Sequence, residues 1–245
     1  MKYDFVSIID RQGKDAMAVD VVGKFSGFEL PQEGFDFIPM WVADMNFATV
    51  PTVQKKILER TEHPTFGYFI TRDEYYEAII NWQEKRNNVA RLTRECIGYE
   101  NGVLGGVVSA LNAFATPGDS ILVHSPTYVG FTGSITNAGY KIVLSSLKKD
   151  EEGIWRMDYE DMDRKIKKNR IHVAVFCNPH NPTGRVWERE ELRKALEVYR
   201  KNDCIVICDE IWSDIILNEN QHIPMQSLDE DARNRVIALY APSKT

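Results

Sequence analysis

Three polar side chains, each coming after an apolar run, have the types needed for joint chemistry. Asn181 offers an amide, Asp209 a carboxylate and Lys244 an amine. A neutral lysine amine can add to an aldehyde, and a buried carboxylate gains a partner in a protonated ring nitrogen. An amide can donate a hydrogen bond to an oxygen on the same ring. The three groups therefore suit one kind of ligand, an aromatic aldehyde that contains a ring nitrogen.

The apolar runs predict the strands that position these groups. The runs cover residues 173–177, 205–208 and 235–240. They are short, unbroken and bounded by turn residues, as buried parallel strands are. Ligands of open α/β sheets bind outside the carboxyl ends of the strands. We therefore expect all three groups at one edge of one sheet.

The loop at residues 178–184 reads Asn-Pro-His-Asn-Pro-Thr-Gly and follows the first of these runs. Pro179 and Pro182 each restrict the residue before them to extended or turn geometry, so Asn178 and Asn181 are expected to be held in place. The loop fits a ligand site at a strand end, but it also fits a plain turn that leads into a helix. The residues alone leave both interpretations open.

The rest of the chain predicts the layers around these strands. Strand patterns also occur at residues 120–124 and 141–145, and helical patterns at 51–60, 73–87, 128–138, 158–168 and 188–201. Strands and helices alternate from residue 95 onward, and right-handed crossovers then place the loops that enter helices at one edge. The predicted fold class is α/β, with a mostly parallel sheet sandwiched by helices.

A glycine-rich stretch at residues 97–106 predicts a short strand, a turn and a helix that runs through Ala115. A helix N-terminus offers backbone N–H groups and a positive dipole end, which suit a phosphate. Gly102 permits a tight turn and close backbone approach, so the amides of Val103 and Leu104 are candidate phosphate ligands. The spacing matches neither a dinucleotide fingerprint nor a Walker loop. An ordinary turn between strand and helix remains the structural alternative.

Composition limits the function classes. The 245 residues carry a net charge of −6 and are 43% hydrophobic, which is typical of one large or two small globular domains. An acidic chain gives no electrostatic footprint for nucleic acid, and no apolar run has membrane-spanning length. The cysteines and histidines show no metal-ligand spacing, so no metal site is predicted. We interpret the four cysteines as reduced core residues of a cytoplasmic protein.

The motifs Asn-Pro-x-Asn-Pro-Thr-Gly, Asp-Glu and Ser-Lys occur here in this order, at residues 178–184, 209–210 and 243–244. In this the chain resembles the fold-type-I pyridoxal-phosphate enzymes of the class I/II aminotransferase superfamily. It is most similar to the cystathionine β-lyase-type C–S lyases, and the resemblance extends from about Trp41 to Thr245. Three segments also resemble the C–S lyases: Trp41–Phe47, Phe66-Gly67-Tyr68 and Asp209–Asp214.

The resemblance implies pyridoxal 5'-phosphate as the cofactor and assigns roles to residues. Catalytic roles fall to Lys244, which would bind the cofactor covalently and act as base, to Asp209 under the ring nitrogen, and to Tyr128, which would stack on the ring. The implied cofactor contacts are Gly102, Val103, Leu104, Tyr128, Asn181, Asp209, Lys244, Tyr68 and Ser243. The implied substrate contacts are Trp41, Ala43 and Asn181. Three positions depart from the pattern of relatives: Asn46, Trp212 and Ala241.

The resemblance also implies a domain organisation. Residues 1–45 are expected to form an N-terminal arm or small-domain segment, and residues 46–245 a cofactor-binding large domain that is incomplete at its C-terminal end. The C-terminal small domain of the family, and the arginines that bind phosphate and substrate carboxylate there, would come after Thr245. The partner implied is a second copy of the chain, with Tyr68 reaching the neighbouring site.

The expected function is β-elimination from cystathionine or a cysteine-type amino acid, which yields pyruvate, ammonia and a thiol. An aminotransferase uses the same catalytic residues, so transamination remains an alternative. A catalytically inactive pyridoxal-phosphate-binding regulator or fragment is the third possibility. The motifs alone do not separate these three.

Overall fold

The computed structural model describes residues 3–24, 27 and 29–244. The chain divides into two compact units, Met1–Ile70 and Thr71–Thr245, which are described separately. The domain division predicted from the sequence, at residue 45, remains a prediction.

The described residues of the first unit form two helices, α1 (Met17–Asp20) and α2 (Pro51–Thr61). Pro51 occupies the first turn of α2, where its missing N–H leaves no helical bond unmade, and this confirms the helix predicted from residue 51. None of the α2 side chains is buried.

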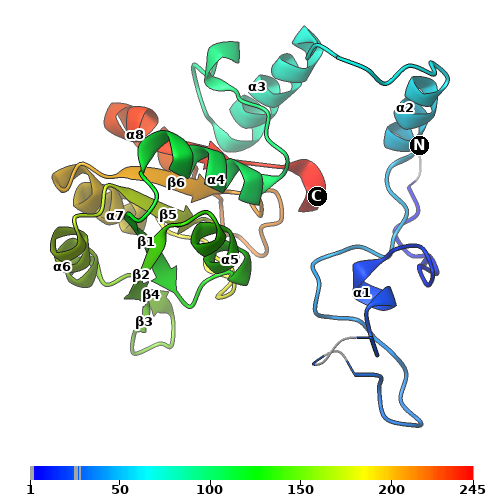
Figure 1. The fold of residues 1–245 in the computed structure, drawn as a ribbon, viewed down its shortest axis with the longest axis horizontal. Coiled ribbons are helices and arrows are strands. Elements are labelled where there is room, and N and C mark those ends of the chain that lie inside the picture. The colour runs from blue at the N-terminus through cyan, green and yellow to red at the C-terminus, as the bar shows by residue number, and fades with distance from the viewer. Residues whose placement is uncertain (1–2, 25–26, 28, 245) are drawn as a thin grey trace. The chain divides into compact units, whose positions relative to one another are not determined.

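The second unit is built on a five-stranded sheet in which every neighbouring pair is parallel (Figure 1). Its strands, in spatial order, are β2 (Lys141–Ser146), β1 (Ser120–Ser125), β5 (Val173–Cys177), β6 (Ile205–Asp209) and β7 (Val236–Leu239). A small antiparallel hairpin, β3 (Lys148–Lys149) and β4 (Trp155–Arg156), follows β2. The predicted parallel sheet is therefore confirmed.

Helices cover both faces of this sheet. The α-helices of the second unit are α3 (Asp73–Asn87), α4 (Val103–Phe114), α5 (Val129–Asn137), α6 (Tyr159–Asn169), α7 (Arg189–Lys201) and α8 (Glu230–Arg235). Short 3₁₀ helices are η1 (Arg94–Cys96), η2 (Met225–Ser227) and η3 (Pro242–Lys244). None of the helices in the described part of the chain is long and apolar enough to cross a membrane.

Alternation along the strands explains the layers, because successive strand side chains point to opposite faces. Phe176 and Cys208 pack with α6 and α7 in one core cluster. Cys177 and Ile207, each one residue away, pack with α4 and α5 in the other. Both clusters are apolar, and the central strand β5 lies between them with every residue buried, as predicted for its unbroken apolar run.

Three local predictions were wrong. No strand forms at residues 97–101, where the backbone before α4 is irregular. Tyr128 is the extended N-cap residue of α5 and lies just before the helix, whereas the pattern placed it inside. Cys96 is exposed, whereas the other three cysteines are buried, because it closes a short 3₁₀ turn outside the sheet.

Candidate functional site

The carboxyl ends of β5, β6 and β7 are level with one another. Cys177 pairs in register with Asp209, and Asp209 pairs with Leu239. Pairing continues one residue further, because Asn178 N donates to Asp209 O at 2.9 Å and Glu210 N donates to Leu239 O at 2.8 Å. The three loops that carry the predicted polar groups therefore leave the sheet from the same edge, as expected.

Asp209 is a buried carboxylate at this edge, with 4% of the residue exposed. Strand alternation directs it to the face covered by α4 and α5, the face that Ile207 also occupies. Ile211 N donates to its Oδ1 at 2.9 Å. Among the described residues, no cation forms an ion pair with it.

Burial raises the pKa of Asp209 to about 6, and the nearby Glu210 carboxyl adds to the rise while the Ile211 amide opposes it. A carboxylate held in this way is stabilised by any cation that reaches it. The protonated nitrogen of an aromatic ring is such a cation, and it fits the predicted role of Asp209.

The loop at residues 178–184 is closed by its own hydrogen bonds. Gly184 N donates to His180 O at 2.8 Å, and His180 N donates to Arg185 O at 2.7 Å. Gly184 has φ +73°, a left-handed value that favours glycine. The loop is thus a tight turn before α7, which confirms the turn interpretation, and the site interpretation remains a prediction.

The two asparagines of this loop differ in their surroundings. Asn178 is fully buried, and its Nδ2 donates to Ile223 O at 2.9 Å. Asn181 is half-buried, with its backbone N 3.5 Å from the sulfur of Cys177. Asn178 therefore anchors the loop, and the predicted role of Asn181 as a ligand-binding amide remains a prediction.

A cavity of about 390 Å³ opens beside this loop. It is lined by Pro179, His180, Asn181, Pro182, Gly184, Val186, Trp212, Ile215, Leu217, Asn218 and Asn220. Asn181 comes from the β5 loop and Trp212 from the loop after β6. The cavity thus places a candidate ligand-binding amide next to an aromatic wall.

Lys244 ends η3, the turn that follows β7, and is half-buried. Its Nζ lies 5.8 Å from the centroid of the Trp212 ring, within range of a cation–π contact. Trp212 comes only three residues after Asp209, so the lysine of the β7 loop contacts the β6 loop. Ser243, the other candidate in this turn, is exposed.

The N-terminus of α4 lies close to the same edge. Gly102 caps the helix with φ +79° and makes no side-chain cap, so the first amides of α4 have no acceptor within the helix. A Cβ on Gly106 would lie 3.0 Å from Cδ2 of Leu239, at the end of β7. The amides of Val103 and Leu104 are therefore candidate anion ligands beside the turn that carries Lys244.

Tyr128 is a neighbour of this helix start. A Cβ on Gly130 would clash with the Tyr128 ring and lie 3.0 Å from Cδ1 of Leu104, so both side chains pack over the glycine. The Tyr128 ring meets Phe131 edge-on, with centroids 5.5 Å apart and an interplanar angle of 84°. Tyr128 thus packs with the α4–α5 core cluster, the face to which Asp209 points.

The remaining predicted residues belong to the first unit. Trp41 and Ala43 are exposed there, and Trp41 Nε1 donates to Ala18 O at 3.2 Å. Tyr68 has 111% of its reference surface exposed. Their predicted roles at a cofactor or substrate site remain predictions.

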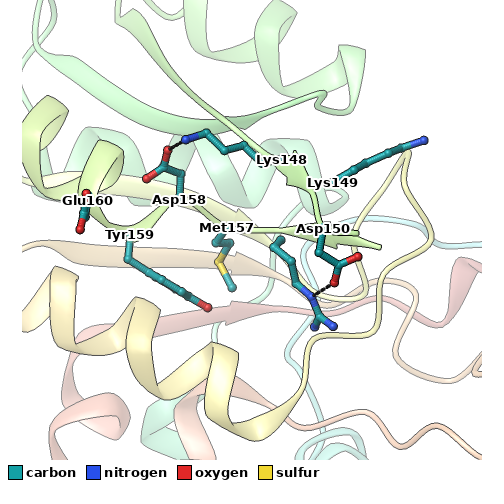
Figure 2. A pocket seen from close by; sticks show the side chains of 8 residues that line it. Lys148, Lys149, Asp150, Met157, Asp158, Tyr159 and Glu160 are labelled. Carbon is teal, nitrogen blue, oxygen red and sulfur yellow. Dashed lines mark hydrogen bonds and ion pairs between the residues drawn. The ribbon is translucent and has the colours of Figure 1, made fainter. Parts of the chain in front are cut away.

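A second pocket, of about 340 Å³, adjoins the hairpin and the start of α6 (Figure 2). Four of its charged groups form two ion pairs, Lys148 with Asp158 and Arg156 with Asp150 at 2.8 Å. It follows β2, four strands from β7 and so roughly 19 Å away across the sheet. Because these charges already have partners, we do not assign the pocket a ligand.

Two contacts near the edge were not predicted from the sequence. Asp214 and Tyr240 are hydrogen-bonded at 2.5 Å although they lie on different strand loops. Glu210 and His222 are both buried, with Oε2 3.4 Å from Nε2. No described group of three or more His, Cys, Asp or Glu side chains could hold a metal ion.

Comparison with known proteins places this geometry in context. The family model described as aminotransferase class I and II matches residues 36–245. Cystathionine beta-lyase PatB of Bacillus subtilis (strain 168) is 32% identical over 236 residues, which cover 96% of this chain and 59% of the relative. Protein MalY of Escherichia coli (strain K12) is 27% identical over 227 residues, covering 92% and 56%.

Solved structures agree with the fold. Cystalysin from Treponema denticola, which contains a pyridoxal 5'-phosphate cofactor, superposes with a TM-score of 0.90 at 30% identity, covering 100% of this chain and 60% of that one. The PLP-bound C–S lyase from Staphylococcus hominis gives a TM-score of 0.85 at 31% identity, with 100% and 60% coverage. The chain spans less than two thirds of the length of these proteins.

Proposed function

The chain belongs to the aminotransferase class I and II family, and from that premise we propose that it is a pyridoxal-phosphate-dependent C–S β-lyase. Its substrates would be cystathionine or other cysteine-type amino acids, and its products pyruvate, ammonia and a thiol. The observation that carries the proposal is the buried Asp209 carboxylate, level with the ends of β5 and β7 and paired with no described cation.

The residues at this edge fit the cofactor. Asp209 would pair with the ring nitrogen, and the amides of Val103 and Leu104 at the uncapped start of α4 would hold the phosphate. Tyr128 would stack on the ring, and Asn181 would donate to the ring oxygen. The bound cofactor would supply an electron-withdrawing ring that stabilises negative charge at the substrate α-carbon.

Lys244 would perform two tasks in turn. It would anchor the aldehyde of the cofactor covalently, and its Nζ, once displaced by the substrate amine, would take the proton from the substrate Cα. The electron pair of the Cα–H bond would form a double bond to Cβ as the C–S bond breaks, and the leaving thiolate would take up a proton to give the thiol. Addition of water gives pyruvate and ammonia. Half-burial of Lys244 against the Trp212 ring would keep bulk water from much of the amine.

Transamination is a second candidate, because the same residues serve it. A specific observation favours it: glutamate-pyruvate aminotransferase AlaA of Escherichia coli (strain K12) is 33% identical over 155 residues, 63% of this chain. In that reaction the proton would return to the cofactor and a 2-oxo acid would be needed to complete the cycle.

One assay separates the proposals. The protein is incubated with pyridoxal 5'-phosphate and cystathionine, with and without an added 2-oxo acid, and pyruvate and thiol are measured. We expect both products without the 2-oxo acid. A strict requirement for the 2-oxo acid would identify an aminotransferase, and cofactor binding without any turnover would support a non-catalytic binding protein.

We also infer a cytoplasmic homodimer in which Tyr68 reaches the site of the partner subunit. The full exposure of Tyr68, flanked by exposed Phe66 and Phe69, supports a surface that another chain covers. Mixing a Tyr68→Ala variant with a Lys244→Ala variant tests the arrangement, since each hybrid dimer would regain one intact site. Activity that stays at zero after subunit exchange would contradict it.

A further inference from the structure

Asp214 carries a buried carboxylate in the turn after β6, with only 3% of its side chain exposed. Tyr240 Oη donates to its Oδ2 at 2.5 Å, and Trp82 Nε1 donates to its Oδ1 at 3.1 Å. Arg86 Nε lies 4.0 Å from the same Oδ1. Hydrogen bonds to a charged acceptor are shorter and stronger than neutral ones, so the Asp214 carboxylate firmly links the residues that donate to it.

The hydrogen bonds to Asp214 connect three elements of the second unit. Asp214 comes five residues after Asp209, Tyr240 comes four residues before Lys244, and Trp82 and Arg86 belong to α3. In the sheet, β6 and β7 are last paired at Asp209 and Leu239. Beyond that pair, the segments that follow β6 and β7 are joined again by the hydrogen bond between Tyr240 and Asp214.

The donors suit this task. Burial, and secondly the hydrogen bond to Asp214, raise the pKa of Tyr240, so its hydroxyl stays protonated and continues to donate. Arg86 also lies over the Trp82 ring, 5.3 Å from its centroid, which supports the indole of α3 from the other side. The carboxylate therefore accepts one hydrogen bond from the residue that follows β7 and one from α3.

We propose that Asp214 is a positioning residue: through Tyr240 it fixes the turn that carries Lys244 against the β6 loop, and so determines where the Lys244 amine stands. The 5.8 Å approach of Lys244 Nζ to the Trp212 ring agrees with this proposal, because Trp212 lies two residues before Asp214 in the same turn. The inference rests on the proposed function, in which Lys244 bonds to the cofactor aldehyde.

The test separates cofactor binding from covalent capture. Variants Asp214→Asn and Tyr240→Phe and the double variant are compared with the unmodified protein. The rate of covalent capture of pyridoxal 5'-phosphate is followed by visible absorbance at saturating cofactor. Affinity for 4'-deoxypyridoxine 5'-phosphate, which lacks the aldehyde, reports the site without the lysine bond.

We expect each single variant to capture the cofactor about 10-fold to 100-fold more slowly, because misplacing a reacting group by about 1 Å has an effect of that size. Affinity for the analogue should change by less than about threefold. The double variant should capture the cofactor no more slowly than the slower single variant, since both substitutions remove the same Asp214–Tyr240 hydrogen bond. Asp161→Asn is the matched control. It neutralises another buried carboxylate, which is bonded to Ser145 on β2, and should leave the capture rate unchanged.

Capture by Asp214→Asn at the unmodified rate would overturn the inference, as would an equal fall in analogue affinity or equal slowing by Asp161→Asn. Failure of the proposed function looks different. The unmodified protein would then neither capture the cofactor nor bind the analogue, whatever the variants do.

Discussion

The backbone amide of Asn178 donates to the carbonyl oxygen of Asp209 at 2.9 Å. This bond extends the β5–β6 pairing past Cys177, so the first residue of the Asn-Pro loop is fixed to the residue that carries the buried carboxylate. The side chain of Asn178 is also anchored, to Ile223 O at 2.9 Å. The start of the Asn-Pro loop is therefore hydrogen-bonded to the strand end that carries Asp209, as the proposed cofactor site requires.

Replacing Asp209 by Asn should change the pH dependence of stability in the cofactor-free protein. The folded-state pKa is raised to about 6 from the ordinary 3.8, so the folded protein holds this proton more tightly than the unfolded chain. Raising the pH through the window from about 4 to about 6 therefore lowers the unfolding free energy by about 3 kcal/mol, and Asp209→Asn should lack this loss.

Urea unfolding at pH 4.5 and pH 7.5 checks this prediction. Asp209→Asn should be more stable than the unmodified protein at pH 7.5 and similar to it at pH 4.5, yet lose most turnover once cofactor is added. An identical pH dependence in both proteins would show that the carboxylate is not destabilised by burial.

His124 should produce the opposite slope. Burial, and secondly the nearby His180, lower its pKa to about 3 from 6.5, so the unfolded chain binds this proton more readily. The contribution is complete above pH 6.5 and declines as the pH falls below it, by about 2 kcal/mol at pH 5. His124→Gln should remove that acid-side decline in urea unfolding at pH 7.5 and pH 5. His172→Gln, at an exposed position, is the control and should keep the decline.

Gly102→Ala should weaken binding of the cofactor phosphate. Gly102 has φ +79° and ψ 163°, a region open almost only to glycine, so a Cβ would disturb the start of α4 by about 1–3 kcal/mol. Affinity for pyridoxal 5'-phosphate should fall by about tenfold, whereas affinity for pyridoxal, without the phosphate, should change little.

Gly118→Ala is the matched control, because Gly118 also has a positive φ, +98°, and open space around it, but lies in the turn before β1. It should lower stability to a similar degree without changing the preference for the phosphate. Equal losses of phosphate-bearing and phosphate-free ligand in Gly102→Ala would remove α4 from the site.

Lys244→Ala should abolish the visible absorbance of covalently held cofactor and all turnover. Lys148→Ala is the control, since Lys148 is an exposed lysine paired with Asp158 at the far edge of the sheet. Mass spectrometry after borohydride reduction gives a second measurement, with the cofactor mass expected on the peptide that contains Lys244. A cofactor adduct on a different lysine would contradict the assignment.

The sequence by itself determined the parallel sheet, the level strand ends and the candidate groups on them. These features are local: an unbroken apolar run reports burial on both faces, a turn motif ends it, and alternation with helices brings the ends to one edge. The helix at Asp73–Asn87 was also predicted with both of its ends. Its end signals are local too, since acidic residues lie in its first turn and basic residues in its last.

Only the tertiary structure decided what surrounds those groups. Asp214 meets Tyr240 across 26 positions of sequence and Trp82 across 132, and no periodic pattern reports a bond between loops so far apart. Three other features also depend on tertiary packing. They are the contact of Lys244 with the Trp212 ring, the packing of Tyr128 and Leu104 over Gly130, and the exposure of Cys96. Side-chain contacts beyond the strand ends depend on how separate loops pack together. That packing is determined only when the helices and the sheet assemble into the folded protein.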